Sequence, residues 1–265
     1  MTLKYILMSK PKRPRTGKAK LNRKLDLEEL DYSEDRINEP VFLQNNRDRN
    51  YTIKNKYTLN DVHKSFLDLC LYEKSKMIIV DGSAGTAKTY LSALAGLTLL
   101  KAKKIEHIVY IRSIVESATK SIGALPGEID EKFKPWSLPL LDKLNELIPS
   151  PIAHSLIADG HIKCVPVNFV RGLTFHDSLV IVDEAQNLTK DELVTILTRF
   201  GHNTKYVVIG DSKQRDIGKL SGFAEIAGRF DDEECAEQGI HSIKFGENEI
   251  VRSAILKFIV RKLGC

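Results

Sequence analysis

The chain has 265 residues, of which 42% are hydrophobic, so it is long enough for one globular domain with its own core and an extension. Its net charge of +5 arises in the first 25 residues, which hold nine Lys or Arg and no acid; the remainder holds 31 basic and 35 acidic residues. The body of the chain is therefore not a basic nucleic-acid-binding surface overall. It also contains no apolar run of about 18 residues, so we expect no membrane-spanning helix and no membrane partner.

Two regions are expected, a basic tail with a variable extension at 1–55 and a single domain at 56–265. Prolines and a glycine in the first 24 residues argue against a stable helix, so we expect this tail to be disordered. Its charge fits either attraction to nucleic-acid phosphates or a solvated tail, and both interpretations remain open. The four cysteines are far apart, without a Cys-x-x-Cys pair, which predicts no zinc site, no disulfide framework and a cytoplasmic location.

Hydrophobic periodicity predicts alternating helices and strands from Tyr57 onward. The first helix is a stripe at 59–70, with Asn60 and Asp61 as candidate caps. The predicted strands cover 76–81, 107–112, 162–167, 179–183, 205–210 and 240–245, and the later helices cover 87–102, 137–148, 190–200 and 249–262. A loop is expected at 121–135 and a solvated acidic loop at 231–234. This alternation predicts an α/β fold, a mostly parallel sheet with helices on both faces.

A phosphate-binding loop is predicted between the strand at 76–81 and the helix that follows it. Backbone N–H groups of such a loop and of the open helix N-terminus bind a polyphosphate. Lys88 would reach the β- and γ-phosphates, and the Thr89 hydroxyl would ligate Mg²⁺. An ordinary strand-to-helix turn with a buried lysine is the alternative. The residues of the loop are Gly82, Ser83, Ala84, Gly85, Thr86, Ala87, Lys88 and Thr89.

Ala87 departs from the Gly-x-x-x-x-Gly-Lys-Thr pattern, which has glycine at this position. If the position needs a positive φ, the alanine strains the loop and lowers affinity for the nucleotide. If it does not, the methyl group needs only a little space. Lys88 and Thr89 would have little reason to stand at these positions in a loop that does not bind nucleotide, so we expect the second case.

Two further polar groups follow apolar strands. Ligands of open α/β sheets bind outside the carboxyl ends of the strands, so these groups belong beside the loop. Asp183 would hold Mg²⁺ through water, and Glu184 would polarise the attacking water as general base. Gln214 is placed to sense the γ-phosphate, and Asp211 to order water or metal. A polar turn after a strand is the alternative for the last pair.

With these motifs in this order, the chain resembles the PhoH family of ATPases, whose members resemble the motor core of superfamily 1 helicases. The likeness covers about 58–260, with weaker stretches at 115–116, 122–127 and 245–253. The strongest stretches are 82–89, 170–175 (Val-Arg-Gly-Leu-Thr-Phe), 182–189 (Val-Asp-Glu-Ala-Gln-Asn-Leu-Thr) and 210–214 (Gly-Asp-Ser-Lys-Gln).

The resemblance implies a RecA-like P-loop NTPase with ATP and Mg²⁺ as ligands and single-stranded RNA or DNA as partner. Arg252 matches a family arginine that would act as an arginine finger or form a surface ion pair. Arg171 and Thr174 would either couple to nucleic acid or shape a loop. His63 stands where relatives carry the glutamine that reads adenine, so the resemblance makes it a candidate nucleotide-binding residue. Histidine can hydrogen-bond or stack but lacks the paired donor and acceptor of glutamine, which leaves the preference between ATP and GTP open.

Three function classes follow: a nucleic-acid-stimulated ATPase, a small-molecule kinase and a nucleotide-binding scaffold with little turnover. The Asp-Glu-Ala-Gln run at 183–186 disfavours the kinase. The chain has length for one motor domain, whereas a helicase clamps its strand between two. We therefore expect a homo-oligomer, such as a hexameric ring, in which Arg252 is supplied in trans.

Overall fold

The structure is a computed structural model, and it describes residues 51–113, 129–214, 217–251 and 254–263. The six strands are β1 (Met77–Gly82), β2 (His107–Arg112), β3 (Ile162–Pro166), β4 (Ser178–Asp183), β5 (Thr204–Gly210) and β6 (Ile240–Phe245). The α-helices of the described residues are α1 (Asp61–Leu71), α2 (Lys88–Lys101), α3 (Ile129–Leu147), α4 (Ser150–Ala158), α5 (Lys190–Leu197), α6 (Phe223–Arg229), α7 (Glu233–Glu237) and α8 (Ala254–Leu263). Short 3-10 turns include η2 (Val167–Phe169), η3 (Ala185–Asn187), η4 (Gly218–Leu220) and η5 (Glu247–Glu249).

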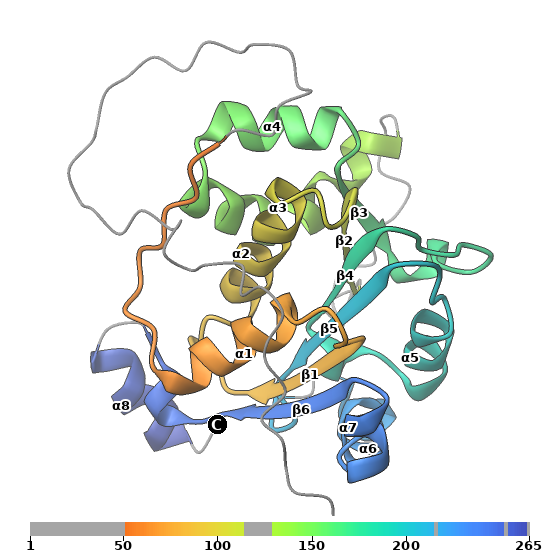
Figure 1. Cartoon of the computed structure of the whole chain (residues 1–265). Helices are drawn as coiled ribbons and strands as arrows, with labels where there is room; N and C mark the ends of the chain where they lie inside the picture. The colour runs from red at the N-terminus through yellow and green to blue at the C-terminus, as the bar shows by residue number, and fades with distance from the viewer. Residues whose placement is uncertain (1–50, 114–128, 215–216, 252–253, 264–265) are drawn as a thin grey trace, which may run out of the picture.

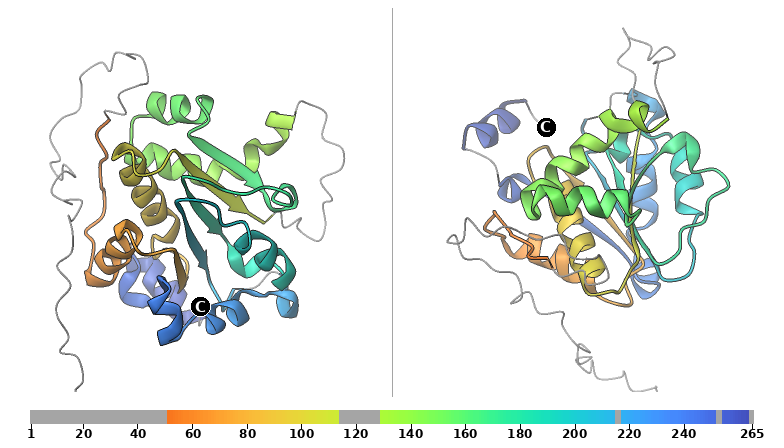
Figure 2. Two further views of the ribbon diagram at one scale, coloured as in Figure 1. Left: turned by 45° about the vertical axis from the view of Figure 1, so that its right-hand side comes forward. Right: turned by 90° about the horizontal axis from the view of Figure 1, so that it is seen from above.

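The strands form one parallel sheet in the order β3-β2-β4-β5-β1-β6. Helices α1 to α4 lie on one side of this sheet, and α5 and α6 lie on the other (Figures 1 and 2). The α/β fold with helices on both faces is the one that the sequence predicts. None of the helices in the described part of the chain combines the length and the apolarity needed to cross a membrane.

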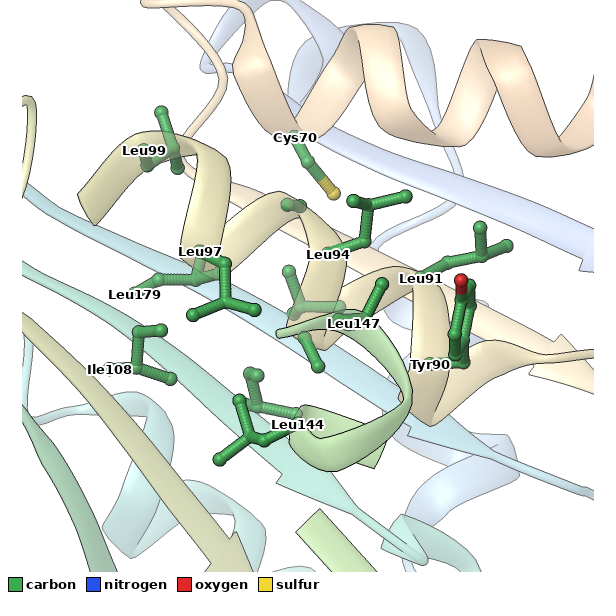
Figure 3. Close-up of a cluster of buried hydrophobic side chains, with 14 of the residues drawn as sticks. Cys70, Tyr90, Leu91, Leu94, Leu97, Leu99, Ile108, Leu144, Leu147 and Leu179 are labelled. Carbon is green, nitrogen blue, oxygen red and sulfur yellow. The ribbon is translucent and has the colours of Figure 1, made fainter. Parts of the chain in front are cut away.

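Alternate strand residues bury into two separate cores, because successive side chains of a strand point to opposite faces. On one face Ile108 and Leu179 pack with α1 to α4, and Figure 3 shows leucines of α2 and α3 meeting there. On the other face Val180 and Val208 pack with α5 and α6. Central strands are buried on both faces, so they read as continuous apolar runs.

Most predicted elements are confirmed with boundary shifts of a few residues, and Asn60 caps α1 by accepting from the His63 N–H. Three expectations need correction. The loop predicted at 121–135 ends earlier, because α3 begins at Ile129 and continues through Pro135. Helix α4 was not predicted. The acidic stretch is exposed but not all loop, since Asp232 caps the short helix α7.

Residues 51–54, which precede the predicted start of the domain at residue 56, pack against its core. Tyr51 and Ile53 are buried in the core on the α2 side, and the Tyr51 hydroxyl donates to the Leu97 carbonyl at 3.1 Å. The Lys54 N–H donates to the Leu147 carbonyl at 2.8 Å. Residues 51–54 therefore brace α2 against α3.

The strand order decides where the polar residues meet. Strands β4, β5 and β1 are neighbours, so their carboxyl ends open side by side at one edge. Asp183 ends β4, Gly210 ends β5 and Gly82 ends β1. The next strand in the other direction, β2, brings Arg112 into register with Asp183.

Candidate phosphate-binding site

The loop between β1 and α2 is held by a hydrogen bond within it and by another from a distant segment. The buried Thr86 hydroxyl donates to the Ser83 carbonyl at 2.8 Å, and the Val251 N–H donates to the Gly85 carbonyl at 3.2 Å. Gly82 is required by close approach, since a Cβ there would lie 2.6 Å from the Phe245 Cβ on β6. Gly85 is required by its φ of 83°. The chain therefore forms the strand, turn and helix start that a phosphate-binding loop needs.

Ala87 adopts the left-handed conformation, with φ 63° and ψ 20°, immediately before the first residue of α2. The expectation that this position does not need a positive φ is therefore wrong. For a residue with a Cβ, this conformation costs roughly 1–2 kcal/mol. The loop keeps the backbone path that glycine would take and carries the strain of the methyl group.

Lys88 folds back onto the loop. Its ammonium donates to the Gly82 carbonyl, and to the Ser83 carbonyl at 3.0 Å. Burial lowers the pKa of this lysine, against the opposing effect of nearby carboxylates. These carboxylates belong to Asp211, Glu184, Asp183 and Asp81. The Lys88 ammonium, which would contact a bound polyphosphate, is thus hydrogen-bonded to backbone carbonyls, and the nearby carboxylates balance its charge.

Asp183 is buried, at 4% exposure, and its carboxylate accepts three hydrogen bonds. The Thr89 hydroxyl donates to it at 3.1 Å, the Glu184 N–H at 2.9 Å and the Tyr110 hydroxyl at 2.6 Å. Burial and the neighbouring carboxylate raise the pKa of Tyr110 far above its ordinary value, so this phenol stays a donor. Sequence reasoning missed Tyr110, because only the pairing of β2 with β4 places it beside Asp183.

The donor set of Thr89 and Asp183 fits Mg²⁺. A hydroxyl oxygen and a carboxylate from separate elements meet within 3.3 Å, and Mg²⁺ prefers such hard oxygen ligands with water in its remaining positions. These are the two residues that the sequence assigns to the metal.

Glu184 also has a left-handed backbone, with φ 52°. The Gln186 side-chain amide donates to its carboxylate at 2.5 Å, and the Arg112 guanidinium lies 3.8 Å from the other carboxylate oxygen. The Gln186 carbonyl oxygen in turn accepts from the Asp211 N–H at 3.0 Å. Gln186 therefore ties the proposed general base to the turn that follows β5, a role that sequence reasoning did not assign.

The turn after β5 is fixed from two sides. The Asp81 carboxylate accepts from the Ser212 N–H at 2.8 Å and from its hydroxyl at 2.7 Å. The Asp211 carboxylate accepts from the Lys213 N–H at 3.0 Å, and its second oxygen is buried without a partner among the described residues. Gln214 is exposed.

A cleft joins these groups into one site. Its volume is about 230 Å³. Residues 84–89 of the loop line it, and so do Asp183, Glu184, Asp211 and Gln214. Gly82 and Ser83, which the sequence also predicts as binding residues, do not line it. The cleft extends beyond these residues to Tyr57, Tyr90, Lys143 and Val251.

Among the described residues, His63, Arg171 and Thr174 do not line this cleft. His63 is buried at 1% exposure with its ring packed against Phe245, and it does not line the cleft. Arg171 and Thr174 lie exposed in the loop after η2. Arg252 lies outside the described residues, as do the stretches at 115–116 and 122–127; only its chain neighbour Val251 is seen at the loop.

Comparison with known proteins gives one consistent result. A model of the family described as PhoH-like protein matches residues 60–263. Protein PhoH of Escherichia coli (strain K12) is 36% identical over 187 residues, 69% of this chain and 51% of that protein. The PhoH-like protein of Bacillus subtilis (strain 168) is 34% identical over 193 residues, 71% of this chain and 58% of that protein. The chain thus spans little more than half the length of these two relatives.

Replacing Ala87 by glycine should stabilise the protein. The change relieves about 1–2 kcal/mol of left-handed strain and returns about 0.4–1 kcal/mol of chain entropy to the unfolded state. We expect a net gain of about 0.5–1 kcal/mol in the free energy of unfolding, measured by urea titration. Ala224→Gly, on the exposed face of α6, is the control and should lose stability. A loss of stability in both variants would contradict the strain at Ala87.

Removing the Tyr110 hydroxyl should destabilise the protein more than removing a buried tyrosine hydroxyl that donates to an uncharged backbone carbonyl. Tyr110→Phe deletes a buried hydrogen bond to a charged group, for which we expect a loss of about 2 kcal/mol. Tyr206→Phe deletes a buried bond to the Ile196 carbonyl and should cost about 1 kcal/mol. Urea unfolding of both variants makes the comparison. Equal losses would show that the Asp183 charge adds nothing to the Tyr110 bond.

His63 should make the folded protein sensitive to mild acid. Burial lowers the pKa of its imidazole below the ordinary 6.5. As the pH falls through 6.5, the imidazole therefore becomes protonated in the unfolded chain while it stays neutral in the folded chain. The stability tied to neutral His63 is present above that ordinary pKa and is lost as pH falls below it. Thermal unfolding at pH 7.5 and pH 5 should show a smaller fall in Tm for His63→Gln than for the native chain. Parallel falls would rule out this contribution.

Proposed function

This chain belongs to the PhoH-like protein family, and from that premise we propose that it binds ATP with Mg²⁺ and hydrolyses it. The observation that carries the proposal is the meeting of Thr89 and Asp183 beside Lys88 at the N-terminus of α2. A phosphate-binding loop alone would support nucleotide binding. A carboxylate pair at the end of β4, which β5 separates from β1 in the sheet, adds the groups that hydrolysis needs.

Binding would use the loop from Gly82 to Thr89. Backbone N–H groups and the α2 N-terminus would hold the phosphates, and Lys88 would exchange its carbonyl partners for β- and γ-phosphate oxygens. Thr89, directly, and Asp183, through water, would hold Mg²⁺, which neutralises charge on the phosphates.

Hydrolysis would use the residues after β4 and β5. Glu184 would polarise a water whose oxygen attacks the γ-phosphorus while the bond to the bridging oxygen of ADP breaks. Gln186 would keep the Glu184 carboxylate oriented, since it holds one of its oxygens. Gln214 would sense the γ-phosphate, and Arg252 would stabilise the charge that develops, in cis or from a neighbouring subunit.

Coupling to single-stranded RNA or DNA is the finer part of the proposal. The support is the exposure of Arg171 and Thr174 in the loop after η2, together with the basic tail at 1–25. A homo-oligomeric ring, a hexamer for example, would supply the second wall that a single motor domain lacks. We keep a cytoplasmic location as a prediction of the cysteine spacing.

One observation favours a second candidate, a nucleotide-binding scaffold with little turnover. Ala87 holds the loop in a strained conformation at the point where the backbone approaches the phosphates. A methyl group there can lower affinity or misplace the γ-phosphate. Kinetics separate the two functions.

Phosphate release from ATP with Mg²⁺ should exceed that of Lys88→Ala, which serves as the blank. We expect Glu184→Gln to lower turnover by about 10²- to 10⁴-fold while ATP still binds, because the amide cannot accept the water proton. Glu237→Gln, exposed on α7, is the matched control and should turn over like the native chain. Adding single-stranded RNA or DNA should raise turnover with one of them. Equally slow hydrolysis by the native chain and Glu184→Gln would favour the scaffold.

A further inference from the structure

The cleft has a second end that neither the phosphate chemistry nor the family match explains. Beyond the loop and Thr89, it is lined by Tyr57, Tyr90 and Lys143. These residues come from the segment before α1, from α2 and from α3. Three elements distant in sequence therefore converge where the part of a nucleotide beyond its phosphates would extend.

Tyr57 is held on two sides. Its ring meets the ring of Tyr90 edge to face, with centroids 4.7 Å apart, and its hydroxyl donates to the Glu146 carboxylate at 3.2 Å. Tyr90 is itself fixed, since it is 2% exposed and its hydroxyl donates to the Asn55 side chain at 3.1 Å. Tyr57 is only partly buried. A ring fixed in this way offers a rigid aromatic wall to a planar ligand, at little cost in side-chain entropy.

Lys143 supplies a positively charged donor at the same end. Its ammonium pairs with Asp142 at 2.8 Å and with Glu146, the residue that also holds Tyr57. Its side chain is 19% exposed. An ammonium has three N–H donors and no acceptor, so these two partners leave one donor for a ligand. The cluster thus combines an aromatic wall with a single fixed donor.

We propose that Tyr57 and Lys143 form the nucleobase end of the site, where a purine stacks on Tyr57 and accepts a hydrogen bond from Lys143. The inference rests on the proposed function. Adenine and guanine share the N7 acceptor, so a lone donor does not separate them. Pyrimidines also carry acceptors, but their single ring covers less of Tyr57 than a purine does, so the stacking on Tyr57 favours purines. His63 is not needed for this recognition, in keeping with its burial outside the cleft.

Equilibrium binding tests the base end apart from the phosphate end. The probes are ATP, GTP, UTP and tripolyphosphate, all with Mg²⁺. For the native chain we expect ATP and GTP to bind within a few-fold of each other, with UTP and then tripolyphosphate weaker. Lys143→Met and Tyr57→Leu should each weaken ATP about tenfold, a loss in the range for stacking on an aromatic side chain or one hydrogen bond to a charged group, and leave tripolyphosphate unchanged.

Two matched variants control for the loss of a lysine outside the cleft and for the loss of the Tyr57 hydroxyl alone. Lys64→Met removes an ion-paired lysine of α1 that does not line the cleft and should change nothing. Tyr57→Phe keeps the ring and should keep most of the ATP affinity. Tyr57→Leu should also reduce the difference in affinity between ATP and UTP, because it removes the ring on which the purine stacks, and general damage to the fold would not do this.

The outcomes separate the two levels of the argument. Native protein that binds tripolyphosphate as tightly as ATP, or variants that weaken both ligands equally, would overturn the base end and leave the phosphate site intact. Native protein that binds neither ligand would overturn the proposed function and this inference together.

Discussion

The attraction between the Lys88 ammonium and the carboxylates around it organises this molecule's polar edge. Asp81 is the penultimate residue of β1, Asp183 ends β4 with Glu184 directly after it, and Asp211 follows β5, so one lysine lies near four acids. Such a cluster would repel itself if the carboxylates were bare. Instead, each accepts a hydrogen bond from a hydroxyl, a side-chain amide or a backbone N–H. The proposed metal cation and phosphates would meet carboxylates and an ammonium that hydrogen bonds already hold in place.

Backbone strain sits at two points of the same edge. Ala87 and Glu184 both have left-handed backbones, a conformation that costs about 1–3 kcal/mol for a residue with a side chain. One precedes the first residue of the phosphate-binding helix and the other carries the carboxylate proposed as general base. Each is held by its surroundings, Ala87 through the loop bonds and Glu184 through Gln186. The strained backbone of this fold thus lies at two residues of the proposed site.

The two ends of the cleft differ in how they are built. The phosphate end consists of strand termini and one helix N-terminus, which follow from the sheet order. The end with Tyr57 and Lys143 consists of side chains on α3 and on the segment that braces α2, joined through Glu146. Catalysis and nucleobase recognition would accordingly depend on different layers of the molecule, and variants can separate them.

The sequence by itself determined the α/β alternation, the bounds of β2 and β6, and the phosphate-binding loop with Lys88, Thr89 and Asp183, because these features depend on local runs of residues and fixed spacings. It did not determine the start of α3 at Ile129, because the helix continues through Pro135, a residue that local pattern reads as a helix breaker. The tertiary structure alone decided the positive φ of Ala87, the burial of His63, and the contacts of Tyr110 with Asp183 and of Tyr57 with Glu146. The last two join residues more than 70 positions apart in the chain, and no periodicity or motif spacing records which strand or helix becomes a neighbour.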